Sequence, residues 1–427
     1  MNAASATPDI TPPATAPFDY DVTIVGAGPV GMALAGWLTR RSATASLRIA
    51  LIDARDPENS SGDPRAIAVS QGSRTLLEAL AWPHEATAIE RIHVSQRGHF
   101  GRTLIDRDDY DLPALGYVAR YGTIVQSLAH AVRATPVHWL HQTQALDPIV
   151  DHDGVTLPVV SAGVERWLRT RILVNAEGGL FRPQSDRAAH GDPDASANAA
   201  KEAAAQAKGE TKRTRDYRQT ALVGVVTLSA PQPHVAWERF TNEGPIALLP
   251  MGGVRGADYA LVWCCSPEEA ERRAQLSDAD FLAELGGAFG SRMGRFTQIH
   301  GRAAFALGLS ALDTLVTGHG RIAAVGNAAQ TLHPVAGQGL NLGLRDAHAL
   351  AEALAHHGAT PLALGHFASQ RALDRRMTIG ATDTLARLFT IDFGPLATLR
   401  GLALTALEFA PPVKSALAHQ MMFGQRI

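Results

Sequence analysis

A glycine-rich turn near the start of the chain limits the possible fold more than any other feature. The stretch 20–25 alternates and then fills with Val and Ile, the turn Gly26-Ala27-Gly28-Pro29-Val30-Gly31 follows, and the stretch 32–41 is typical of a helix. A second apolar strand, 47–52, ends at Asp53. This order of strand, turn, helix and strand, with an acid about 20 residues further on, predicts a dinucleotide-binding βαβ unit.

Each part of this unit has a physical role in binding a dinucleotide. Gly26 allows the tight turn, Gly28 lets the backbone approach a pyrophosphate, and Gly31 lets the helix pack closely on the strand. Asp53 can accept hydrogen bonds from the adenosine ribose. NAD and FAD sites share this pattern, so the βαβ unit alone does not distinguish them.

A second glycine-rich segment, 326–346, lies near the other end of the chain. It follows a short apolar strand, 321–325, and leads into the helix-forming stretch 340–354. A helix N-terminus offers unpaired N–H groups and the positive end of the helix dipole. Gly337 and Gly339 have no side chain to hold a flat ring away from the backbone. Because no other GxGxxG follows a strand, the two segments predict FAD, with one loop for the ADP half and one for the flavin half.

The composition fits a cytosolic enzyme. The chain has 427 residues, 46% of them hydrophobic, and a formal net charge of -2, which argues against a nucleic-acid surface. No apolar run is long enough to span a bilayer. Cys264 and Cys265 are adjacent, and we interpret them as buried apolar residues and not as a redox or metal site. The histidines show no metal-ligand spacing, so no metal is predicted.

Changes in pattern divide the chain into segments. Residues 1–18 predict a disordered leader, and the low-complexity stretch 189–214 predicts a solvated insertion. The strand-rich stretch 215–300, together with 89–116, predicts a substrate domain built on an antiparallel sheet, and 381–427 predicts a helical C-terminal region. The rest predicts a discontinuous FAD-binding domain: 19–88, 117–188 and 301–380. The expected fold class is α/β, a Rossmann-like FAD-binding domain with an inserted antiparallel-sheet substrate domain and a helical C-terminus.

Three further positions stand where a strand or helix meets a loop. Arg65 follows a loop of Pro, Asn, Ser and Gly, and it is either a cofactor contact or an ordinary surface arginine. Gln126 is a polar residue in the first turn of a predicted helix, 123–134. The apolar strand 171–176 stops at Glu177 and two glycines, which marks either a ligand contact or an ordinary strand-to-turn transition. The residues alone leave these alternatives open.

Three longer motifs carry a family resemblance. They are DPRAIAVS at 63–70, WERFTNEGPIALLPM at 237–251 and HPVAGQGLNLGLRD at 333–346. From about Tyr20 to the C-terminus, apart from the insertion, the chain resembles the flavin-dependent aromatic hydroxylases of the para-hydroxybenzoate hydroxylase fold. Within that family it is most similar to the ubiquinone-biosynthesis hydroxylases, above all those that act on a 2-polyprenyl-6-methoxyphenol.

The resemblance implies which positions contact FAD. Four residues would hold the ADP half: Gly26, Gly28, Gly31 and Asp53. Arg65 and Gln126 would approach the pyrophosphate and ribityl region. The pair Glu177-Gly178 stands where the family has an Asp-Gly pair that contacts both FAD and NAD(P)H, and Gly326-Asn327 stands where the family has Gly-Asp, whose acid binds the ribityl chain. Six residues would line the isoalloxazine: Pro334, Gly337, Gln338, Gly339, Leu340 and Asn341.

Two positions depart from the family pattern. Glu177 is longer than the family's Asp by one methylene, and Asn327 is neutral where many relatives carry an acid. Asn327 keeps an amide oxygen that can accept a hydrogen bond. A flavin-bound but catalytically silent subunit of a multi-enzyme assembly would permit both departures, so that alternative stays open.

The resemblance implies an FAD-dependent monooxygenase that hydroxylates the ring of a polyprenylated phenol in ubiquinone biosynthesis. NADH or NADPH would be the electron donor, O2 the co-substrate and a 4a-hydroperoxyflavin the oxygen donor. A second alternative is a flavin hydroxylase of another phenol or another ring position. No catalytic base is identified, and we interpret His333 as a packed or loop-orienting residue.

The C-terminal stretch 385–423 is rich in Leu, Ala and Phe, with prolines that break it into pieces. It predicts either an amphipathic layer that faces a membrane or a partner, or helices packed on the enzyme's own surface. The expected partners are a lipophilic polyprenyl phenol, a ubiquinone-biosynthesis protein complex and, through this stretch, the membrane surface. The expected location is the cytoplasm, with peripheral contact at the inner face of the membrane.

Overall fold

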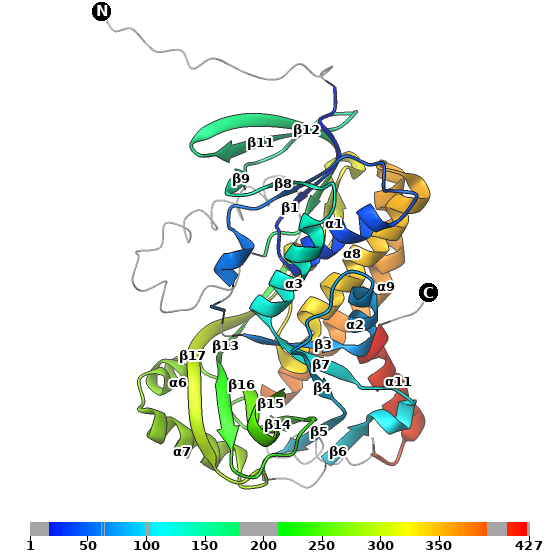
Figure 1. The fold of residues 1–427 in the computed structure, drawn as a ribbon. Helices are drawn as coiled ribbons and strands as arrows, with labels where there is room; N and C mark the ends of the chain where they lie inside the picture. Colours follow the sequence, from blue (N-terminus) through cyan, green and yellow to red (C-terminus); the bar gives the residue numbers. More distant parts are fainter. Residues whose placement is uncertain are drawn as a thin grey trace, which may run out of the picture.

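The computed structural model describes residues 17–60, 62–63, 65–98, 102–178, 212–390 and 408–424, and only the backbone at 336 and 387–390. Most of the predicted leader and insertion therefore lies outside the described residues, as does 391–407 of the apolar C-terminal stretch. The described strands form two large sheets and a small one (Figure 1).

The first large sheet has a parallel centre that grows from the βαβ unit. Its five parallel strands, in spatial order, are β8 (His138–Leu140), β2 (Ile49–Ile52), β1 (Tyr20–Val25), β12 (Val164–Asn175) and β19 (Ile322–Ala324). All four residues of β2 are buried, as expected for a strand that is covered on both faces. The N-terminal half of β12 also pairs with an antiparallel extension. The strands around it are β9 (Thr143–Ala145), β10 (Ile149–Val150), β11 (Val155–Ser161) and, beside β19, β18 (Val316–Thr317).

Helices pack against this sheet and share one hydrophobic core with it. They are α1 (Pro29–Arg40), α3 (Tyr121–Arg133), α8 (Gln338–His357) and the first part of α9 (Pro361–Thr390). α8 approaches the turn after β19 closely, because a methyl group added at Gly343 would lie 2.9 Å from Gly326 Cα. The glycine-rich segment near the C-terminus therefore lies directly beside α1.

A small sheet joins the two large ones. It contains β3 (Ala66–Ser70), β4 (Thr87–Ile89) and β7 (Gly116–Arg120). Two helices pack beside this sheet, α2 (Gln71–Glu78) and α11 (Pro411–Phe423). The stretch 89–96, for which the sequence predicts one strand, is divided at Glu90 between β4 and β5 (Arg91–Gln96). Within the described part of the chain, no helix is both long and apolar enough to cross a bilayer.

The second large sheet has eight strands. In spatial order they are β20 (Gln330–Thr331), β17 (Phe296–Leu312), β13 (Lys212–Leu228), β16 (Asp258–Cys265), β15 (Pro245–Gly252), β14 (Val235–Phe240), β5 (Arg91–Gln96) and β6 (Arg102–Asp106). The predicted antiparallel strands are confirmed, except that β5 pairs with β14 in parallel. β13 begins at Lys212, inside the range predicted as an insertion, because its first residues pair with the end of β17.

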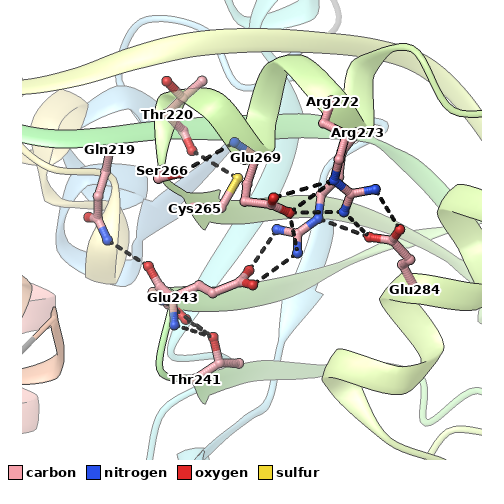
Figure 2. A network of polar contacts seen from close by, with 11 residues as sticks. Gln219, Thr220, Thr241, Glu243, Cys265, Ser266, Glu269, Arg272, Arg273 and Glu284 are labelled. Carbon is pink, nitrogen blue, oxygen red and sulfur yellow. Dashed lines mark hydrogen bonds and ion pairs between the residues drawn. The ribbon is translucent and has the colours of Figure 1, made fainter. Parts of the chain in front are cut away.

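Charged side chains attach two helices to the outer face of this sheet (Figure 2). The helices are α6 (Pro267–Ala274) and α7 (Asp278–Phe289). Arg273 of α6 bonds to Glu243 at 2.6 Å and to Glu284 at 3.2 Å, and its guanidinium lies 4.1 Å from the ring centroid of Trp263. The two cysteines of β16 are buried and free.

A buried ionic network lies where α8, α9 and β20 meet. Arg371 Nε bonds to Asp346 Oδ1 at 2.7 Å, and Arg345 Nε bonds to Asp374 Oδ2 at 3.0 Å. Arg371 also pairs with Asp374. Gln330 Nε2 donates to Asp346 Oδ2 at 2.7 Å. Asp346 is fully buried, so its charge depends on these partners.

Asp346→Asn is expected to destabilise the protein, because it leaves the buried Arg371 without one of its two carboxylates. Removal of one partner from a buried ion pair lowers the free energy of unfolding by about 3–5 kcal/mol. Urea denaturation followed by circular dichroism measures this change. Glu58→Gln, which removes a carboxylate from an exposed pair with Arg133, is the control and should leave the midpoint nearly unchanged. Equal midpoints for the two variants would contradict the role of the network.

Candidate functional site

A single cavity of about 1580 Å³ extends from the turn after β1 to the face of the second sheet. It is lined by eleven of the residues predicted to contact the cofactor: Gly26, Gly28, Asp53, Arg65, Glu177, Gly178, Asn327, Pro334, Gly337, Gly339 and Leu340. Five predicted residues do not line it: Gly31, Gln126, Gly326, Gln338 and Asn341. The cavity therefore brings together the two glycine-rich segments that lie far apart in the sequence.

In the glycine-rich turn after β1, Gly28 leaves room for a ligand, whereas Gly26 and Gly31 are packed against backbone atoms. Gly26 has φ +105°, and a methyl group there would lie 2.6 Å from the carbonyl oxygen of Ala176. A methyl group at Gly31 would lie 2.0 Å from the carbonyl oxygen of Gly26. At Gly28 the nearest atom would be Tyr121 Oη at 3.9 Å, so this position faces open space. A pyrophosphate can approach the backbone there.

Asp53 lines the cavity and also fixes the turn. Its Oδ2 accepts a hydrogen bond from the Ala27 N–H at 2.6 Å, and its Oδ1 accepts one from the Arg55 N–H at 2.8 Å. An ionised carboxylate has about four acceptor positions, so capacity remains for ribose hydroxyls. Asp53 therefore stabilises the glycine-rich turn after β1 and is expected to bind the same ligand as that turn.

Arg65 lies inside the cavity and is held there by two neighbours. Its Nε donates to Asp63 Oδ1 at 2.9 Å, and its guanidinium carbon is 4.5 Å from the Tyr121 ring centroid. Burial acts to lower the pKa of Arg65, but the hydrogen bonds and the charge of Asp63 outweigh it, so the pKa is raised. The structure supports the cofactor-contact alternative for Arg65, since the side chain offers a fixed positive charge to a pyrophosphate.

The structure places Gln126 away from the cavity. It is exposed on α3, whereas Tyr121 and Val125 of the same helix line the cavity. Successive residues of a helix point about 100° apart, so Gln126 cannot share the direction of Val125. Tyr121 was missed by the sequence reasoning, although an aromatic residue at the start of a helix beside a predicted site was a usable signal.

Glu177, Gly178 and Asn327 lie at the edge of the cavity. Glu177 is exposed, and its N–H donates to Asn175 Oδ1 at 3.0 Å. A methyl group at Gly178 would lie 3.4 Å from Asn327 Nδ2, so these two positions face each other. The Asn327 amide is thus beside the two glycine-containing turns, where a ribityl chain would pass.

The flavin loop, residues 326–337, ends in a helix start that has no side-chain cap. Gly337 has φ +59°, which favours glycine, and it is the N-cap of α8 without a capping side chain. α1 also begins without one, at Gly28. By contrast, serine side chains cap α2, α6 and α7. Helices α3 and α11 also lack a side-chain cap, but the starts of α1 and α8 both line the cavity, where their N–H groups can bind a ligand.

Two of the predicted ring-lining residues hold the loop in place instead of lining the cavity. Asn341 Nδ2 donates to the carbonyl oxygens of Ala68 at 3.0 Å and Gly337 at 2.7 Å, and its Oδ1 accepts from the Ser70 N–H at 2.8 Å. Gln338 Nε2 donates to the carbonyl oxygen of Met421 at 3.1 Å. These bonds tie the start of α8 to β3 and α11.

His333 has the hydrogen bonds of a neutral, loop-orienting residue. The Val335 N–H donates to its Nδ1 at 3.2 Å, so the ring proton lies on Nε2, which is 3.1 Å from Gln219 Oε1. Burial lowers the pKa of His333 to about 4. Gln219 Nε2 in turn donates to the carbonyl oxygen of Glu243 at 3.0 Å, as Figure 2 shows. The flavin loop is thereby connected to the second sheet.

FAD fits this arrangement. The cavity is lined by residues at the starts of both α1 and α8, and both Gly28 and Gly339 would present open space to a ligand. Arg65 also lines the cavity and supplies a positive charge. Among the described residues, no group of three potential ligand side chains is placed to hold a metal ion.

The far part of the cavity is an apolar chamber. It is walled by strands β5, β6 and β13 to β17 and by two C-terminal helices, α9 and α11. The lining side chains from the helices are apolar: Leu385, Leu417, Ala418, Met421 and Met422. One acidic residue, Glu238 of β14, also lines this chamber. Sequence reasoning used the motif around Glu238 but missed the residue, although it interrupts an apolar face of a predicted strand.

A family model described as FAD binding domain matches residues 19–363. The chain belongs to this FAD-binding family. The ubiquinone hydroxylase UbiL of Rhodospirillum rubrum is 30% identical over 441 residues, which cover 98% of this chain and 94% of the relative. The 3-demethoxyubiquinol 3-hydroxylase of Escherichia coli is 28% identical over 410 residues, which cover 92% of this chain and 96% of the relative.

The solved structure of p-nitrophenol 4-monooxygenase PnpA from Pseudomonas putida shares the fold. Its TM-score is 0.71 at 15% identity, with 95% of this chain and 99% of that chain covered. The protein is an FAD-dependent monooxygenase that uses NADH or NADPH and O2. The predicted family, fold class, enzyme class and cofactors are therefore confirmed.

Gly339→Ala is expected to weaken FAD binding at least tenfold without loss of stability. A methyl group there meets no protein atom within 4 Å, and alanine favours a helix, but the methyl enters the space proposed for the flavin. Titration of the apoprotein with FAD, followed by flavin fluorescence, measures the affinity. Gly380→Ala is the matched control, because Gly380 is also helical and open but lies outside the cavity. Equal affinity in both variants would show that the flavin does not lie over Gly339.

Proposed function

We propose that this monooxygenase hydroxylates the aromatic ring of a polyprenylated phenol in ubiquinone biosynthesis. The observation that carries the proposal is the apolar chamber, which continues directly from the flavin loop. Two relatives that align over nearly the whole chain carry names from ubiquinone chemistry, which supports the same substrate class. Bound FAD would supply electron transfer from the reduced nicotinamide to O2 and the oxygen transfer that no side chain performs.

The chain's own residues would bind the cofactor and exclude water. Arg65 and the free N–H groups of α1 would hold the pyrophosphate, and the start of α8 would hold the electron-rich edge of the ring. This proposal includes the contacts predicted between the site residues and FAD, and a contact between Glu177 and the nicotinamide. The apolar walls would keep water from the reacting ring and would accept a prenyl chain.

We also propose that α11 brings the enzyme to a membrane surface. Phe409 and Val413 are 83% and 60% exposed, and Leu417 is 40% exposed while it also lines the cavity. An apolar surface that is continuous with an apolar chamber suits a lipophilic substrate. The same surface would serve a ubiquinone-biosynthesis protein complex, and the cytoplasmic side of the membrane is the proposed location.

The holoenzyme is expected to lose its oxidised-flavin absorbance when it is mixed with NADH or NADPH without O2. After O2 and 2-geranyl-6-methoxyphenol are added, mass spectrometry should find a product with one more oxygen atom. Reduction without that product would favour a different phenol or ring position. A flavin that is never reduced, with or without a phenol, would indicate a catalytically silent subunit.

Cells that lack this protein provide the second arm of the test. These cells are expected to accumulate a polyprenyl phenol and to contain less ubiquinone. Chromatography of lipid extracts measures both. Normal ubiquinone in such cells would reject a necessary role in that pathway.

Val413→Glu is expected to reduce binding to vesicles of phosphatidylethanolamine and phosphatidylglycerol severalfold, because it places a charge on the apolar surface of α11. Sedimentation with the vesicles measures binding. Leu362→Glu on α9 is the control, since Leu362 is 67% exposed and does not line the cavity. Hydroxylation of the short-chain phenol in detergent should be the same for both. Unchanged vesicle binding by Val413→Glu would remove the membrane role of α11.

A further inference from the structure

Glu238 lies in a row of residues that crosses the second sheet. Directly paired residues of neighbouring strands point to the same face of a sheet. The row takes one residue from each of six strands: Thr103, Val94, Glu238, Ala247, Val262 and Val223. All six line the cavity. The carboxylate therefore stands in a wall that is otherwise formed by small apolar side chains and one threonine.

The neighbours of Glu238 along β14 place it opposite the flavin loop. Ala236 and Phe240 lie two residues away on either side, on the same face of the strand and about 7 Å along it. Ala236 shares a hydrophobic cluster with Ala68 of β3, and Phe240 shares one with Val335 of the flavin loop. Glu238 is thus bracketed by contacts to the two elements that form the proposed flavin site.

The carboxylate of Glu238 has no hydrogen-bond or ion-pair partner in the described part of the chain. Burial raises its pKa to about 7, because the ionised form loses its solvation. An unpaired carboxylate in an apolar wall destabilises a fold, so packing does not explain it. The side chain is partly exposed because it opens into the cavity, so a molecule bound there can supply its partner.

The side chains that surround Glu238 carry no charge. Val94, Ala247 and Val262 face it from β5, β15 and β16. Cys264 of β16 is a buried thiol whose pKa is raised, first by burial and then by the charge of Glu238. His333 of the flavin loop stays neutral at ordinary pH because burial lowers its pKa to about 4. Glu238 is therefore the group in this chamber that can change charge near neutral pH.

A phenol needs a hydrogen-bond acceptor in such a chamber. Its hydroxyl loses water on entry, and an unpaired hydroxyl in an apolar environment costs free energy. An ionised carboxylate accepts hydrogen bonds and does not donate them. A ring also reacts faster with an electrophilic oxygen when its hydroxyl proton is removed, and a base works best when its pKa is near the operating pH.

We infer that the Glu238 carboxylate binds the hydroxyl of the phenolic substrate and takes its proton as the ring is hydroxylated. This inference rests on the proposed function. In the step, the phenol O–H bond breaks and an O–H bond forms on Glu238. The electron pair stays on the phenol oxygen and is shared with the ring carbons ortho and para to it. A C–O bond then forms at one of these carbons with the oxygen that bound FAD would deliver. When the product regains its aromatic ring, the hydrogen on that carbon leaves as a proton to water, and Glu238 returns its proton to the phenol oxygen.

Glu238→Gln tests the inference, because glutamine has the same shape and cannot take the proton. With the FAD-loaded enzyme and 2-geranyl-6-methoxyphenol at pH 7, we expect hydroxylation to slow by about 100-fold or more. The share of NAD(P)H that ends as H2O2 should rise. FAD affinity and flavin reduction without phenol should not change. Glu238→Asp, which restores a carboxylate at a greater distance, should recover part of the rate.

The pH profile separates a proton acceptor from a wall residue. In the wild type, hydroxylation should rise with pH through a group with a pKa of about 7. In Glu238→Gln this rise should be absent, and the rate should increase only as the free phenol ionises, near pH 10 for an ordinary phenol. The control is Glu165→Gln, which removes an exposed carboxylate from β12 and should leave the wild-type profile unchanged.

As pH rises, the stability of the wild type should fall while its rate of hydroxylation rises. The pKa of Glu238 is raised from 4.5 in the unfolded chain to about 7 in the fold, so its ionisation destabilises the protein as pH rises through that range. Glu238→Gln should therefore have a higher Tm than the wild type at pH 8 and a similar Tm at pH 4.5. Unchanged rate, coupling and pH profile in Glu238→Gln would overturn the inference. A wild-type enzyme that hydroxylates no phenol would instead overturn the proposed function.

Discussion

The buried charges between α8 and α9 fix the part of the molecule on which the cofactor site depends. Gln330 stands within the flavin loop and Asp346 follows the first turns of α8, and the two are hydrogen-bonded to each other. Arg371 holds Asp346 from α9. The loop between these anchors is therefore closed at both ends, so its free N–H groups are positioned before any ligand arrives. Such preorganisation reduces the entropy that binding would otherwise cost.

The same loop is also attached to the wall of the substrate chamber. His333 bonds to Gln219 of β13. Gln219 in turn bonds to Glu243, in the turn between β14 and β15, and Glu243 pairs with Arg273 (Figure 2). This series of contacts runs from the flavin loop to the outer helices of the second sheet. A shift of the sheet would therefore have to break these polar contacts, of which the bond between His333 and Gln219 is buried. These contacts attach the flavin loop to the wall of the chamber.

Local sequence patterns predicted the cofactor half better than the chamber. The spacing of Gly26, Gly28 and Gly31 specifies a backbone shape, so those residues could be interpreted without a partner. Asn341 was assigned to the ring, but its side chain points into hydrogen bonds with β3, which lies far away in sequence. The position of Glu238 in the chamber wall becomes clear only when six strands are paired in register. Non-local pairing of this kind cannot be inferred from one strand's own residues.

The length of strands β13 and β17 limits how molecules can enter and leave the chamber. β13 and β17 have 17 residues each, which corresponds to about 55 Å at 3.3 Å per residue. One end packs with Leu342 and Ile379 beside the ionic network, and the other forms the chamber wall. The two strands, with β-bulges along their pairing, therefore connect the region beside the ionic network to the chamber wall within one sheet. A molecule that enters the chamber must therefore pass side chains at its lining, and Leu417 of α11, which is 40% exposed and also lines the cavity, stands at such a place.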